Sequence, residues 1–134
     1  MRLQRRGDAN HEWALYGGKG VLDVEWYFRD TTALPSSVML YHLEPGTEEG
    51  EHLHLEGDDD SCSTHSSDEL YVVVRGEVIV TVDGEREVLR SGDAVYAPHG
   101  SRHGVANESD APAELILVFG PPKPDARTVV AGPH

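Results

Sequence analysis

Three histidines and a glutamate carry the clearest chemical signal in this chain. His52 and His54 stand two positions apart, Glu69 follows them, and His103 lies further along. In a β-strand, residues two apart point to the same face, so His52 and His54 can enter one cavity while Leu53 faces away. Imidazole and carboxylate groups that converge in this way can bind one divalent metal ion.

Each of these residues also has an ordinary structural explanation. A His-x-His pair in a strand can be exposed or hydrogen-bonded in a core, and a lone histidine after a Pro-Gly turn is commonly solvated. The lone cysteine, Cys62, can neither form an internal disulfide nor supply a thiolate cage. Any metal must therefore be bound by imidazole and carboxylate groups, and it is their combination that favours a metal site.

The elements that must position these residues are strands. Along residues 22–29, LDVEWYFR, apolar and polar side chains alternate, which is typical of a half-buried strand, and helical spacing is not sustained. The dipeptide Asp83-Gly84 predicts a hairpin, because a type I′ turn needs positive φ. Further strands are expected at 38–43, 52–55, 70–74, 77–82, 85–90, 94–96, 103–107 and 114–119. Short strands of this kind predict an all-β sandwich or barrel.

The spacing of the candidate ligands resembles the two sequence motifs of the cupin superfamily. The second motif, G(X)5PXG(X)2H(X)3N, is met in full by Gly92, Pro98, Gly100, His103 and Asn107. The first, G(X)5HXH(X)3–4E(X)6G, is met by Gly46, His52, His54, Glu69 and Gly76, except that fourteen residues separate His54 from Glu69. The resemblance implies a small single-domain cupin, with a double-stranded β-helix or jelly-roll-like barrel that binds a divalent metal ion. The ligands it implies are His52, His54, Glu69 and His103.

The inserted segment LEGDDDSCSTHSSD adds a further candidate, His65. It precedes Glu69 at the spacing that the family's second histidine normally has. His65 can replace His52 or His54 as a ligand, contact a substrate at the mouth of the pocket, or simply be solvated. Because residues 56–67 are small, polar and charged, we expect a loop that gates the metal site, with an idle surface insertion as the alternative. Cys62 has no adjacent base and is expected to be inert.

The resemblance implies a metal-dependent enzyme for small molecules and leaves the reaction open. Imidazole and carboxylate ligands suit Fe(II), Zn, Ni, Mn or Cu, and among these we expect Fe(II) and a mononuclear dioxygenase. The alternatives are a non-redox cyclase, isomerase or lyase on Zn or a similar ion, and a non-catalytic small-molecule binder or sensor. We expect Tyr71, His65 and His42 to be catalytic residues near the substrate. Further candidates for the pocket wall are Trp26, Tyr27, Tyr41 and Tyr96.

The charge and hydropathy of the chain exclude several classes of partner. The 24 acidic and 11 basic residues give a formal net charge of −13, which repels phosphate backbones and anionic lipid surfaces. No apolar run approaches the roughly twenty residues needed to cross a bilayer. No apolar stretch follows the N-terminal arginines as a secretory signal requires. We therefore expect a cytoplasmic protein that binds neither nucleic acid nor membrane.

A length of 134 residues predicts one domain. We expect an N-terminal arm at 1–19, the cupin barrel at 20–120 and a Pro-rich tail at 121–134, where prolines interrupt strand pairing. The long apolar strands and the tail favour a homodimer in which the N-terminal strand of one subunit covers a sheet edge of the other.

Overall fold

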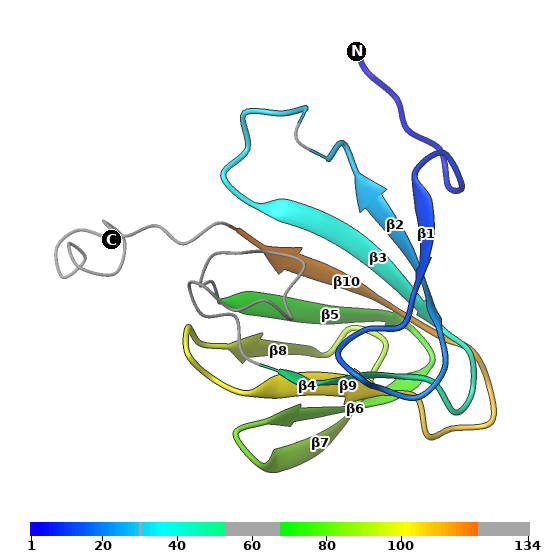
Figure 1. Cartoon of the computed structure of the whole chain (residues 1–134), viewed down its shortest axis with the longest axis vertical. Helices are drawn as coiled ribbons and strands as arrows, with labels where there is room; N and C mark the ends of the chain where they lie inside the picture. The colour runs from blue at the N-terminus through cyan, green and yellow to red at the C-terminus, as the bar shows by residue number, and fades with distance from the viewer. Residues whose placement is uncertain (30, 53–67, 121–134) are drawn as a thin grey trace, which may run out of the picture.

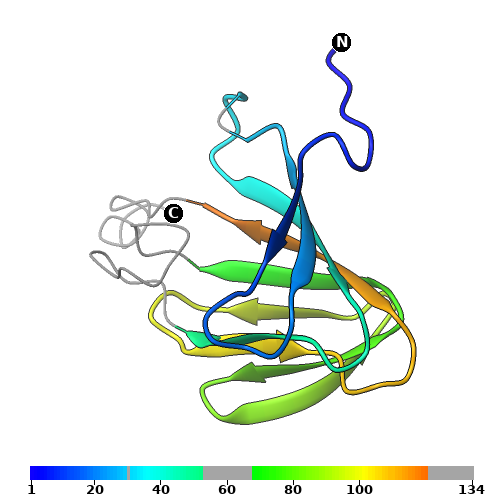
Figure 2. The same cartoon turned by 45° about the vertical axis from the view of Figure 1, so that its right-hand side comes forward.

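Ten β-strands and no helix occur in the part of the chain that the structure, a computed structural model, describes: residues 1–29, 31–52 and 68–120. They form two antiparallel sheets whose strands are drawn in Figures 1 and 2. The six-stranded sheet has the order β1 (Asn10–Trp13), β2 (Leu22–Tyr27), β3 (Ser37–Leu43), β10 (Ala113–Phe119), β5 (Glu69–Arg75) and β8 (Ala94–Ala97). The four-stranded sheet has the order β4 (Glu48–His52), β9 (His103–Ala106), β6 (Glu77–Val82) and β7 (Glu85–Arg90). The prediction of an all-β fold is confirmed.

One apolar core fills the space between the sheets. Its fully buried side chains come from both of them, with Tyr41 and Tyr71 from the larger sheet and Val78 and Val80 from the smaller one. The predicted alternation is confirmed in β2, where Leu22 and Val24 are buried in this core. Burial of each large apolar side chain contributes about 1.5–3 kcal/mol, so the core holds the two sheets in the positions on which the site depends.

The N-terminal arm expected at residues 1–19 contains a strand of the sheet. Strand β1 pairs with β2 of the same chain, with Trp13 opposite Leu22. The polar sequence NHEW is too short to show a period of two, which is why β1 was not predicted. Among the described residues, no helix is long and apolar enough to cross a membrane.

The predicted hairpin at Asp83-Gly84 is confirmed. Both residues have positive φ, 48° and 85°, and Val82 pairs with Glu85 across the turn. The Asp83 backbone N–H donates to the carbonyl of Arg102 at 2.7 Å, and the Arg102 N–H donates to Asp83 Oδ1 at 2.9 Å. The hairpin therefore anchors the residue that precedes His103.

Asn107 ties together three parts of the barrel. Its buried Nδ2 donates to the carbonyls of Leu43 at 2.9 Å and Ala111 at 2.8 Å, while its Oδ1 accepts from the Ser109 N–H at 3.0 Å. Gly46, in a turn with φ 85°, donates its N–H to the Asn107 carbonyl at 2.9 Å. Gly46 is the first residue of the first motif and Asn107 is the last residue of the second. Their contact thus holds the β3–β4 turn against the end of β9.

Candidate metal centre

His52, Glu69 and His103 meet inside the barrel. His52 ends β4 and lies directly opposite His103 at the start of β9, whereas Glu69 begins β5 in the other sheet. These strand ends lie on one side of the molecule, at the left of Figure 1. All three side chains are buried, and one ligand atom of each lies within 4.8 Å of the others.

The distances fit a shared metal ion. Glu69 Oε2 lies 3.0 Å from His103 Nε2 and 3.9 Å from His52 Nε2. Ligands at about 2.1 Å from one ion are about 3 Å apart when adjacent and about 4.2 Å apart when opposite. Both observed distances fall between these limits, so an ion requires only small movements of the three side chains.

Backbone carbonyls orient both imidazole rings. Nδ1 of His52 lies 2.8 Å from the Gly50 carbonyl, and Nδ1 of His103 lies 3.0 Å from the Ser101 carbonyl. A carbonyl can only accept, so Nδ1 carries the hydrogen in both rings and Nε2 is the nitrogen that faces Glu69. A backbone carbonyl on the second ring nitrogen is the usual partner of a metal-bound histidine, because it fixes tautomer and ring direction.

The protonation of His103 is linked to Glu69. Burial lowers the pKa of His103, but the hydrogen bond to Glu69 and the charges of Glu69 and Glu49 raise it further, so the net pKa lies above the ordinary value. A divalent cation held by His103 would take the place of that proton, since a metal ligand must be neutral imidazole. Metal affinity at these residues should therefore increase with pH.

A second carboxyl group, Glu49, is buried beside the three candidate ligands. It accepts hydrogen bonds from the hydroxyls of Tyr41 at 2.6 Å and Tyr71 at 2.7 Å. Burial first, and the charge of Glu69 next, raise the pKa of Glu49 to about 8. The group can therefore hold a proton near neutral pH next to the candidate metal site.

The sequence did not indicate Glu49 because a β-bulge changes the strand parity. Glu49 pairs with Val105, and His52 pairs with His103, so three steps along β4 match two along β9. In an unbulged strand, Glu49 and His52 would face opposite sides. The extra residue turns both side chains inward. Only the small run GTEEGEH around a glycine marks the place in the sequence.

Aromatic rings border the three candidate ligands. Tyr16 stacks on His52 with ring centroids 3.5 Å apart and planes 8° apart. On the other sheet, Phe119 lies directly opposite Glu69 in the β10–β5 register, and Trp26 packs against it at 5.9 Å. These rings are an apolar part of the surroundings of the site, and burial beside them strengthens electrostatic interactions among the candidate ligands.

The structure separates the predicted catalytic residues. Tyr71 lies beside the site, with its ring 6.1 Å from that of His103, but it is fully buried and its hydroxyl is bonded to Glu49. The prediction that His42 lies near the substrate is wrong. His42 follows Tyr41, whose side chain enters the core, so it points to the outer face of the sheet. There it contacts Glu114 at 2.9 Å and Glu44 at 2.5 Å.

The other expected site residues divide in the same way. Trp26 and Tyr41 belong to the buried core, whereas Tyr27 and Tyr96 alternate with inward-facing neighbours and point outward. His54 and His65 lie outside the described residues, as do Cys62 and the segment 56–67 expected to gate the site. Their predicted roles stay predictions.

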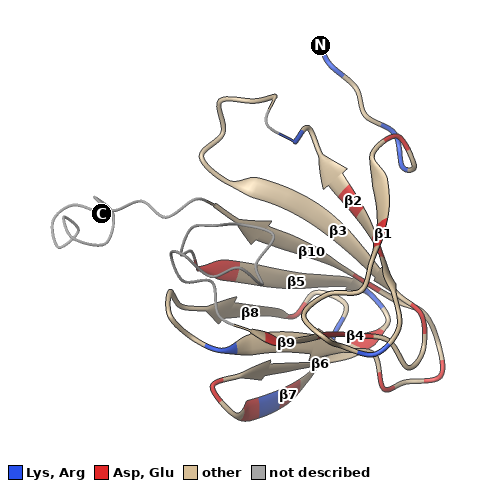
Figure 3. Ribbon diagram, in the orientation of Figure 1, with Lys and Arg blue, Asp and Glu red and all other residues tan. Residues whose placement is uncertain are grey.

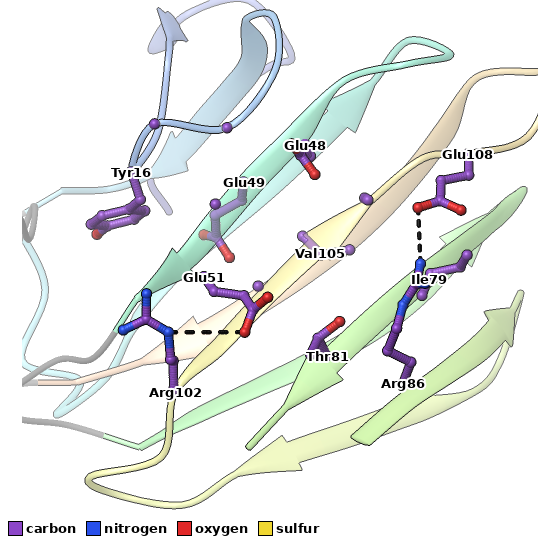
Figure 4. A pocket seen from close by; sticks show the side chains of 15 residues that line it. Tyr16, Glu48, Glu49, Glu51, Ile79, Thr81, Arg86, Arg102, Val105 and Glu108 are labelled. Atoms are coloured by element: carbon purple, nitrogen blue, oxygen red, sulfur yellow. Dashed lines mark hydrogen bonds and ion pairs between the residues drawn. The ribbon is translucent and has the colours of Figure 1, made fainter. Parts of the chain in front are cut away.

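A groove on the outer surface lies on the opposite side of β9 from these ligands. Because alternate residues of a strand face opposite ways, Gly104 lines the groove while His103 points inward. Two ion pairs flank it: Arg102–Glu51 at 3.9 Å and Arg86–Glu108 at 2.9 Å (Figure 4). Exposed pairs of this kind contribute little stability. The groove is a separate surface from the candidate metal centre.

Comparison with known proteins agrees with this arrangement. The family model described as the cupin domain matches residues 55–119. An uncharacterized protein of Streptomyces coelicolor is 34% identical over 87 residues, which are 65% of this chain and 71% of that protein. The tetracenomycin polyketide synthase protein TcmJ of Streptomyces glaucescens is 30% identical over 100 residues, which are 68% of this chain and 60% of that protein.

A solved structure supports the same fold. The predicted oxalate decarboxylase of Thermotoga maritima superposes with a TM-score of 0.76 at 18% identity, covering 91% of this chain and all of that one. At that identity the likeness concerns the fold alone. Together with the two sheets and the buried His-Glu-His group, these matches show that the chain belongs to the cupin superfamily.

Proposed function

We propose that this chain is a metal-dependent enzyme that acts on a small molecule. The observation that supports this most directly is the group His52, Glu69 and His103. Its three buried donors come from both sheets, and backbone carbonyls orient both imidazole rings. His54, two residues beyond His52 in the motif, is proposed as the fourth ligand.

The residues around the candidate ligands suit an enclosed reaction. A divalent ion bound there supplies Lewis-acid chemistry, or redox chemistry if it is iron. The rings of Tyr16 and Phe119 lie next to His52 and Glu69, and Glu49 can hold or accept a proton beside them. The net charge of −13 favours neutral or cationic substrates over anionic ones.

The first candidate reaction is that of a mononuclear Fe(II) dioxygenase. Neutral imidazoles and a carboxylate are ligands that Fe(II) accepts in oxygenases.

The second candidate is a metal-assisted cyclase, isomerase or lyase without redox chemistry. Two observations favour it. Glu49, bonded to Tyr41 and Tyr71, is a proton-transfer group of the kind that enolisation needs. TcmJ, a relative at 30% identity, is named as a polyketide synthase protein, and polyketides carry enolisable carbonyl groups. We therefore propose neutral enolisable or phenolic compounds as the substrate class.

One experiment distinguishes these reactions. The protein, freed of metal, is reloaded with Fe(II) or with Zn(II) and supplied with a panel of enolisable and phenolic compounds. Oxygen uptake that matches substrate loss, with Fe(II) only, identifies the dioxygenase. Substrate loss without oxygen uptake identifies the non-redox enzyme. Tight binding of a compound that is never transformed by any loaded form would instead identify a sensor.

A further inference from the structure

Tyr16 has a backbone conformation that its side chain makes unfavourable. Its φ is 54°, in the left-handed region, and Gly17 beside it has φ 72°. Glycine adopts this region freely, whereas a bulky side chain there is a strained exception. Strain of this kind persists where the surrounding structure holds it, and it is concentrated at functional sites. The Tyr16 side chain must therefore make contacts that offset the strain.

Main-chain contacts hold the loop that carries Tyr16 on strand β4. Leu15 is buried in the core, and its carbonyl accepts hydrogen bonds from the N–H groups of Gly18 and Gly50, both at 3.0 Å. The two backbones lie so close that a Cβ atom on Gly18 would collide with the Glu48 carbonyl, and one on Gly50 with the Tyr16 carbonyl. These contacts do not involve the Tyr16 ring. The backbone of the loop is therefore fixed independently of the ring.

The Tyr16 ring covers one face of the His52 imidazole. The ring centroids are 3.5 Å apart and the planes differ by 8°, and Figure 4 shows the Tyr16 side chain reaching from the loop towards β4. The Gly50 carbonyl holds the edge of the imidazole at Nδ1, at 2.8 Å, and a ring packed on its face prevents it from tilting. Together these contacts fix the direction of Nε2, which lies 3.9 Å from Glu69 Oε2.

The segment around Tyr16 brings no charge of its own to His52. Residues 13–18, WALYGG, are uncharged, and Figure 3 shows most of the stretch between β1 and β2 in tan. An electrostatic effect of these residues on a cation at His52 therefore comes from the Tyr16 ring. The face of an aromatic ring carries negative charge density and attracts cations. An imidazole that binds a divalent cation is electron-poor, so the stack favours the metal-bound form of His52 over the free one.

We propose that Tyr16 is a positioning residue of the metal centre: its ring orients His52 and strengthens the binding of a divalent cation by that imidazole. The inference rests on the metal site of the proposed function and adds to it a residue outside both sequence motifs. The N-terminal segment 1–19, expected to be an arm, thereby takes part in the metal centre. The stack also accounts for a tyrosine at a position where the backbone alone favours glycine or asparagine.

Titration of the full chain, freed of metal, with Co(II) tests this role, because the absorption bands of Co(II) respond to ligand geometry. Tyr16→Asn removes the ring and keeps the left-handed backbone, which asparagine accepts. It should bind Co(II) about tenfold more weakly than the wild type, the order of a desolvated contact between a cation and an aromatic face, and with altered absorption bands. Tyr16→Phe keeps the ring and should bind within about twofold of the wild type.

Two further variants separate the aromatic face from simple packing. Tyr16→Leu keeps an apolar side chain without an aromatic face, and it should bind Co(II) as weakly as Tyr16→Asn. Tyr27→Asn is the matched control, because Tyr27 is a half-buried tyrosine on the outer side of β2, and it should keep the wild-type affinity. Urea unfolding without metal should place Tyr16→Asn close to the wild type, since relief of backbone strain opposes the loss of packing.

The outcomes separate this proposal from the metal centre itself. Equal Co(II) affinity and absorption bands in the wild type, Tyr16→Asn and Tyr16→Leu would overturn the role of Tyr16 and leave the metal centre intact. A loss of affinity in Tyr16→Phe as large as in Tyr16→Asn would also overturn it, because the hydroxyl and not the ring would then be responsible. A wild type that binds no Co(II) would instead overturn the proposed metal function on which the inference rests.

Discussion

His52 and His103 are held by contacts that serve a metal ion better than they serve a packed core. Each ring donates from Nδ1 to a backbone carbonyl and directs Nε2 towards Glu69. A core histidine needs no carboxylate of another sheet within 4 Å. The pattern of His-x-His, Glu and His could be recognised in the sequence, because strand parity and motif spacing are local properties. The orientation of the rings could not, since it depends on carbonyls brought close by folding.

Titration of Glu49 should make the free energy of unfolding depend on pH. The pKa of its carboxyl group, ordinarily 4.5, is raised by burial and by Glu69 to about 8 in the metal-free protein. The neutral form therefore stabilises the native state fully below about pH 4.5, and this contribution is lost as pH rises towards 8. Denaturant unfolding in the presence of a chelator should show the free energy of unfolding falling over this range.

Substitution of Glu49 separates its charge from its hydrogen bonds. Glu49→Gln keeps the size and can still bond to Tyr41 and Tyr71, so it should flatten the pH dependence and change stability at pH 5 by less than about 1 kcal/mol. A smaller slope should remain, because the raised pKa of His103 acts in the same direction. Glu49→Ala should cost about 2–4 kcal/mol at pH 5. A Gln variant with the wild-type slope would show that Glu49 does not titrate in this range.

Strand β4 contains a bulge that the sequence did not predict, whereas the hairpin between β6 and β7 was predicted. The hairpin at Asp83-Gly84 was predicted because the turn type is encoded by two adjacent residues. The bulge between Glu49 and His52 was not, because it depends on pairing with β9. The same limit explains His42: the strand was predicted at 38–43, but the choice of inner face requires knowledge of which side is covered.

Asn107 bonds the backbone at the ends of several strands. It satisfies the carbonyls of Leu43 and Ala111 and the N–H of Ser109 from a buried position. Asn107→Ala should lower the free energy of unfolding by about 2–4 kcal/mol, because these groups lose their partner, while metal binding weakens only mildly. Asn10→Ala, at an exposed position of β1, should change stability by less than about 0.5 kcal/mol. Equal effects of the two changes in chemical denaturation would contradict this role.

At the scale of the whole molecule, the inner side of the larger sheet carries Glu69, Tyr71 and Phe119 towards the strands that bear His52 and His103. The cupin fold, and the meeting of three of the four expected ligands in one place, could be predicted because the motifs are local.

Metal content is the most direct test of the central claim that His52, Glu69 and His103 form a metal centre. Elemental analysis of the purified wild type should find about one divalent ion per chain. His103→Ala should lose most of it, with an unchanged circular dichroism spectrum, because the apolar core remains intact. His99→Ala, an exposed histidine in the preceding turn, should keep the wild-type content. A wild type that binds no ion when metal is supplied, or a His103→Ala variant with full occupancy, would contradict the assignment.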